Sequence, residues 1–106
     1  MSLLIKAKIA CRVSESTVTY NEELTDLIQA CLADLKITDI DEAKLTTEDV
    51  DPLIERAIMT YCKLNFGYAT LTADQRVFLK SSYDEQKSQL LMSSSYTNFG
   101  RGGSSA

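Results

Sequence analysis

Histidine is absent from this chain of 106 residues, and cysteine, proline and glycine are scarce, at three, one and four residues. Histidine is the side chain that most often transfers protons or binds metals near neutral pH, so its absence removes the commonest route to both chemistries. The three cysteines, Cys11, Cys31 and Cys62, are widely spaced and form no CxxC pair. They predict neither a zinc site nor a disulfide framework, and we expect reduced, buried thiols in a cytosolic setting.

Long apolar runs and glycine-rich motifs are missing as well. No segment approaches the ~18 apolar residues of a membrane-spanning helix, and Lys6 and Lys8 interrupt the apolar N-terminal stretch, unlike a signal peptide. Gly67 stands alone, and the other glycines lie beyond residue 99, so no phosphate-binding glycine loop is present. These absences predict a protein that is not an enzyme and has no metal site and no membrane segment.

The composition that remains is that of one small globular domain, with 44% hydrophobic and 25% charged residues. The net charge of −4 is unevenly distributed along the chain. Residues 1–55 contain twelve acidic and five basic side chains, whereas residues 56–106 contain three and six. An acidic chain lacks the basic surface from which most DNA affinity comes, so we expect no specific binding to duplex DNA.

Apolar spacing predicts three or four helices. Residues 3–13 alternate as a strand would, but their alanine, leucine and lysine favour a helix, and no other segment offers a sheet to join. We therefore expect a helix there. Residues 22–36 are apolar at helical spacing, after a capping-box pair, Thr19 and Glu22, with Asn21 as a competing cap.

Two further helices begin at clear signals. Asp51 followed by Pro52 is typical of a helix start, and that helix should end at Gly67. Thr72 and Gln75 form another capping box, and the helix after them should end near residue 93. We expect its apolar contacts from Val77, Phe78, Tyr83, Leu90, Leu91 and Met92.

Residues 37–50 are acidic and weakly periodic, and they predict a connecting loop anchored on the core by Ile37, Ile40 and Leu45. Their aspartates lack the glycine and glutamate spacing of a calcium loop. Aromatic residues gather around the turn before the last helix, and of these we expect Phe66 and Phe78 to lie in the core.

The fold class is therefore all-α, a small bundle of three to four helices with an extended C-terminal tail. We expect residues 1–92 to form the helical domain and residues 93–106 to form a Gly/Ser-rich tail that cannot bury a core. The tail is either solvated or anchored on a partner, and Tyr96, Phe99 and Arg101 are its residues suited to anchoring.

Three blocks of the sequence resemble a known family. They are DPLIERAIMTYCKLNFG at residues 51–67, ELTDLIQAC at 23–31, and FLKSSYDEQK at 78–87 with Leu90 and Leu91 behind it. The chain is similar in these blocks to the head–tail connector (adaptor, or head-completion) proteins of tailed bacteriophages, over about residues 4–92. Residues 37–50 are longer and more acidic than in that family, and the tail has no family motif to match.

The resemblance implies a structural virion protein without a cofactor. Connector subunits assemble as a homo-oligomeric ring, commonly of twelve copies, beneath the portal protein in the neck of the virion. The ring extends the DNA channel, lets DNA pass without specific binding, and meets a downstream neck or tail protein. Under this resemblance the tail should reach the portal.

Three groups of residues become candidate contacts under the resemblance. The side chains that would bind the portal are Tyr96, Phe99 and Arg101. The acidic side chains that would face the lumen or an adjoining ring are Asp39, Asp41 and Glu42. The basic side chains that would meet acidic surfaces between subunits are Arg56 and Lys63.

Two alternatives stay open at this point. A stopper or tail-terminator protein shares the ring arrangement but meets different neighbours. A small helical regulatory protein could instead bind DNA through the third helix, although the acidic charge and the apolar face of that helix oppose this reading.

Overall fold

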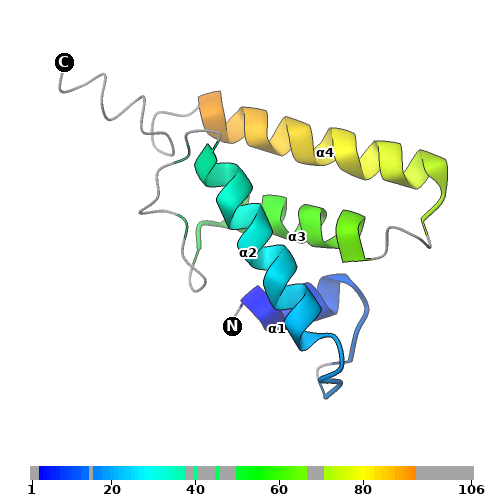
Figure 1. Cartoon of the computed structure of the whole chain (residues 1–106). Coiled ribbons are helices and arrows are strands. Elements are labelled where there is room, and N and C mark those ends of the chain that lie inside the picture. Colours follow the sequence, from blue (N-terminus) through cyan, green and yellow to red (C-terminus); the bar gives the residue numbers. More distant parts are fainter. Residues whose placement is uncertain are drawn as a thin grey trace.

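A computed structural model describes residues 3–14, 16–37, 40, 45, 50–66 and 71–92. This part of the chain is a bundle of four helices, α1 (Leu3–Ala10), α2 (Asn21–Ile37), α3 (Pro52–Phe66) and α4 (Ala73–Met92) (Figure 1). The all-α prediction is confirmed, and the ambiguous first segment is a helix.

α3 is the centre of the bundle, because the other three helices all pack against it. α2 crosses α1 and α3, and α4 runs along the other side of α3 (Figure 1). Each helix contributes apolar side chains to one core. The largest of its fully buried side chains are those of Leu24, Leu35, Ile40, Ile54, Ile58, Leu90, Cys31 and Cys62.

The starts of α3 and α4 are those that the sequence predicts. The Leu53 N–H donates to Asp51 Oδ1 at 3.0 Å, which satisfies one of the unpaired amides of the first turn of α3. At α4, the Gln75 N–H donates to Thr72 Oγ1 at 3.1 Å, and the Thr72 N–H donates back to Gln75 Oε1 at 2.9 Å. This reciprocal pair is a capping box.

The start of α2 differs from the prediction. Its first backbone bond runs from the Leu24 N–H to the Tyr20 carbonyl at 2.9 Å, so Tyr20 occupies the capping position rather than Thr19 or Asn21. The Tyr20 ring packs edge-on against Phe66 at a centroid distance of 5.2 Å. We attribute the shift to this contact, which fixes where the chain enters α2.

A polar cluster joins α2 to α4. The Tyr83 hydroxyl donates to Asp34 Oδ2 at 2.7 Å, and Lys87 Nζ donates to the same oxygen at 3.1 Å. Lys87 also lies 5.0 Å from the centre of the Tyr83 ring, and Cys31 Sγ lies 3.4 Å from the Tyr83 hydroxyl. Burial opposes ionisation of Asp34, but the bonds from Tyr83 and Lys87 outweigh it and lower the pKa of the carboxyl. We call these four residues the Tyr83 cluster.

Several apolar residues that we expected in the core lie outside it. The prediction for Phe66 is confirmed, since it packs against the core, as do Ile40 and Leu45. The predictions for Ile37 and Phe78 are wrong, because these side chains are 82% and 69% exposed. The same holds for three more residues of α4, Val77, Leu91 and Met92.

These residues of α4 are exposed because of how the helix is rotated about its own axis relative to the core. Its buried residues, Tyr83 and Leu90, lie seven positions apart on one narrow stripe. Phe78 precedes Tyr83 by five residues, which places it about 140° around the helix from that stripe. An apolar residue in the correct helix is therefore on the wrong side to reach the core.

Candidate assembly surface

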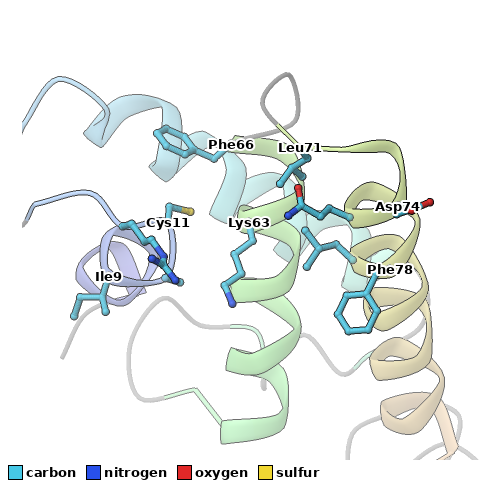
Figure 2. A pocket seen from close by; sticks show the side chains of 11 residues that line it. Ile9, Cys11, Lys63, Phe66, Leu71, Asp74 and Phe78 are labelled. Carbon is cyan, nitrogen blue, oxygen red and sulfur yellow. The ribbon is translucent and has the colours of Figure 1, made fainter.

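A groove of about 870 Å³ lies where the end of α1, the end of α3 and the start of α4 meet (Figure 2). Its wall residues come from all three elements: Ile9, Ala10, Cys11, Arg12, Lys63, Phe66, Leu71, Asp74, Gln75, Phe78 and Leu79. Figure 2 shows α1 and α4 as its two sides, with α3 between them.

The groove is basic at its centre. Lys63 extends from α3 into the space between α1 and α4, whereas Asp74 points away on the outer side of α4 (Figure 2). Arg12 also lines the groove. Both residues are exposed, and neither side chain forms a hydrogen bond or ion pair with another residue in the described ranges.

Arg12 owes its place to an unusual helix end. The Val13 N–H donates to the Lys8 carbonyl at 2.8 Å, and the Arg12 N–H donates to the Ile9 carbonyl at 3.1 Å. These two bonds are a Schellman motif, in which the residue after the cap is left-handed and is usually glycine. Here that residue is Arg12, with φ of 60°.

The rim of the groove is apolar. Ile9 on α1 is 52% exposed, and Phe78 on α4 is more exposed still. An apolar rim around unpaired positive charge is suited to binding a surface that is both acidic and apolar.

The cysteine nearest the groove is not a reactive centre. Burial raises the pKa of the Cys11 thiol, although Lys63 nearby partly opposes the shift. Burial raises the pKa of Cys31 and Cys62 to about 12 in each case. All three thiols are unbonded to one another, and at neutral pH they are protonated and poorly nucleophilic.

The structure brings one predicted contact residue into the groove. Lys63 lines it, whereas Arg56 is exposed about two turns earlier on α3 and lies outside it. The other predicted residues, Tyr96, Phe99, Arg101, Asp39, Asp41 and Glu42, lie outside the described residues.

Sequence reasoning missed Arg12 and Ile9 as members of this surface. The sequence marks this surface only indirectly. No glycine follows α1, so a residue with a Cβ, here Arg12, must adopt the left-handed conformation that ends the helix. In the described ranges no three histidine, cysteine or carboxylate side chains lie close enough to hold a metal ion. None of the helices described is both long and apolar enough to cross a bilayer.

A small helical chain with a basic, apolar-rimmed docking groove has the features of a subunit that works by contact with other proteins. Comparison with protein families identifies which kind of subunit this is. The family model of the phage connector proteins matches residues 3–97, which is most of the chain. The chain therefore belongs to the phage connector family. No curated protein and no solved structure gives a significant match.

Proposed function

We propose that the chain is the adaptor subunit of a phage neck, a structural protein that forms a ring beneath the portal. The ring extends the DNA channel out of the head and joins the head to the tail components. The observation that carries this proposal is the family match, because it spans all four helices rather than one motif.

The charge of the chain supports a passage role. DNA that slides through a channel must break every phosphate contact as it moves, so a lumen that binds phosphates would slow it. The acidic residues Asp39, Asp41 and Glu42 belong to the most acidic stretch of the sequence. We propose that they face the lumen or an adjoining ring.

The remaining contacts follow from the same arrangement. Tyr96, Phe99 and Arg101 of the tail bind the portal, with the aromatic rings as anchors. Arg56 and Lys63 of α3 meet acidic surfaces between subunits, and their exposure fits that role.

Co-sedimentation with purified portal rings tests the proposal. We expect the full chain to sediment with the portal, and electron microscopy of the pellet should show a ring, commonly of twelve copies, below it. A chain that leaves portal rings bare in this assay is not their adaptor.

Deletion of residues 95–106 tests the role of the tail. The shortened chain should keep the helical circular dichroism of the full chain, because the four helices end at Met92. It should no longer join portal-bearing capsids. Normal incorporation would exclude the tail as the portal anchor.

Charge reversal tests the lumen acids. A variant with lysine at positions 39, 41 and 42 should slow DNA passage or prevent assembly, because the new cations bind passing phosphates or repel a basic neighbour. Wild-type infectivity of phage that carry this variant would contradict a charge role.

The stopper and tail-terminator alternatives differ only in the neighbour that the ring contacts, so the same assay with purified tail proteins in place of the portal separates them. A gel shift with duplex DNA at low salt addresses the regulatory alternative. Because α3 is packed by the three other helices, we expect no DNA binding through this helix.

A further inference from the structure

The groove leaves four side chains without partners in the described part of the chain: the cations Arg12 and Lys63 and the apolar Ile9 and Phe78. A partner that covers it must therefore bring both negative charge and an apolar contact.

Arg12 is the first sign that the groove is selected for binding. A left-handed conformation costs a residue with a Cβ about 1–2 kcal/mol, and glycine is free of this cost. Arginine nevertheless occupies the position, exposed and unpaired among the described residues. A strained residue that could be relieved by glycine points to a function for its side chain, which here is a guanidinium at the groove.

The same molecule carries a surface of the opposite character on α2. The buried residues of α2, among them Leu24, Ile28 and Leu35, mark the face that meets the core. The opposite face carries exposed residues at helical spacing: Glu22, Asp26, Gln29, Ala33 and Ile37. We call these five residues the α2 stripe.

The α2 stripe has the properties that the groove requires. Glu22 and Asp26 form no ion pair with a described residue, so their charges are available to a partner. Ala33 is small enough to allow close approach, and Ile37 supplies an exposed apolar side chain at the far end.

The groove and the stripe lie on opposite sides of the bundle. In the view into the groove, α2 lies behind α3 (Figure 2), and in the overall view α2 lies in front of α1 and α3 (Figure 1). A single copy therefore cannot bring its own stripe to its own groove. Complementary patches on opposite faces produce head-to-tail association, which closes into a ring when the rotation between copies allows it.

We propose that the groove of one copy binds the α2 stripe of the next copy, with Arg12 and Lys63 facing Glu22 and Asp26. The proposal rests on the proposed ring and names the contact that builds it. Phe78 and Ile9 supply the apolar part of the groove side, and Ile37 supplies that of the stripe side.

Charge-swapped variants of the full chain test the contact. The groove variant carries Arg12→Glu and Lys63→Glu, and the stripe variant carries Glu22→Lys and Asp26→Lys. Each alone places like charges opposite one another, so assembly on purified portal should need about 100-fold more protein. A chain with all four changes restores opposite charges and should assemble as the wild type does. An equimolar mixture of the two double variants should also assemble, with the variants alternating around an even-numbered ring.

Two matched controls accompany these variants. Glu23→Lys reverses a charge in the same first turn of α2, but residue 23 lies off the stripe, so this variant should assemble normally. Glu85→Lys changes an exposed acid on α4, away from both surfaces, and should also assemble normally. Circular dichroism confirms the fold of each variant.

A cross-link tests the contact independently of charge. Ile9→Cys places an exposed thiol on the groove, and Gln29→Cys places one on the stripe, in a chain that also carries Cys11→Ala. On the portal, a short bismaleimide should join these two sites into a ladder of dimers, trimers and larger species. The ladder should vanish when position 9 is returned to isoleucine. A ladder that persists with isoleucine at position 9, or no ladder from a wild-type-like ring, would overturn the contact.

The outcomes separate the contact from the function. Wild-type rings on the portal with assembly indifferent to the charge swaps would overturn the head-to-tail contact and leave the adaptor function standing. Failure of the four-change chain to recover would also overturn it. A wild-type chain that never gathers on the portal contradicts the adaptor function and the contact together.

Discussion

Removal of one hydroxyl group should measure how α4 is held to the bundle. Tyr83→Phe keeps the ring, which is buried and packs against Tyr61 at a centroid distance of 5.3 Å. It removes the O–H that donates to Asp34 Oδ2 at 2.7 Å and meets Cys31 Sγ. α4 buries only Tyr83 and Leu90, so this bond is a large part of its attachment to α2.

The magnitude follows from the surroundings of Asp34. A hydrogen bond to a charged group is worth about 1.5–3 kcal/mol. Asp34 keeps its bond to Lys87, and its side chain is 36% exposed, so water replaces part of the loss. We therefore expect the variant to lose about 1–2 kcal/mol of unfolding free energy, or roughly 4–12 °C in Tm for a domain of this size.

Urea unfolding followed by circular dichroism is the assay, with Tyr61→Phe as the control. The Tyr61 hydroxyl forms no hydrogen bond with a described residue, so this change should stay within about 0.5 kcal/mol of the wild type. Equal losses in the two variants would refute the reasoning, because the effect would then come from aromatic packing. A Tyr83→Phe protein as stable as the wild type would refute it too.

The same bond has a pH signature. Burial by itself would raise the pKa of Asp34 in the folded state. The bonds from Tyr83 and Lys87 outweigh burial, so the pKa lies below the ordinary value of 3.8. A lowered carboxyl pKa adds stability above the unfolded value, and that stability is lost as the pH falls through the folded value. The stability difference between the wild type and Tyr83→Phe should therefore be full near pH 6 and shrink below the ordinary pKa.

Three further predictions follow from single contacts. Arg12→Gly should stabilise the isolated chain by about 0.5–1 kcal/mol in urea unfolding, because glycine relieves the left-handed cost but has more freedom when unfolded; a loss of stability would contradict the strain. Asp51→Ala should cost about 0.5–2 kcal/mol in the same assay, through its bond to the Leu53 N–H. Native protein at pH 8 should take up iodoacetamide at Cys11 at most, by mass spectrometry, because burial raises the pKa of Cys31 and Cys62 to about 12.

Local signals in the sequence were enough to predict where two of the four helices, α3 and α4, begin. Asp51 with Pro52, and Thr72 with Gln75, act within one turn of backbone, so the residues that cap the helix also identify it. The left-handed turn at Arg12 has no such signal, because the usual marker, glycine, is absent there.

The surfaces were harder to predict than the helices. Apolar residues mark α4 as a helix, but their order alone does not say which of them meets a neighbour. Once Tyr83 is known to be buried, the angle around the helix between Tyr83 and Phe78 shows that Phe78 faces away from the core. The Tyr83 cluster joins residues 49 positions apart, Asp34 and Tyr83, and only the tertiary fold brings them together.

Assembly and stability are coupled in a chain of this kind. A domain of about 100 residues buries only about 60–65% of the surface that its unfolded chain exposes. In this one α4 is attached by a narrow stripe, while Phe78 on the rim of the groove stays largely exposed to water. A neighbour that covers Phe78 would add buried apolar area to a helix of 20 residues in which only two side chains are buried. Because such a neighbour would bind only the folded chain, assembly of the proposed ring would raise the free energy of unfolding of its subunits by mass action.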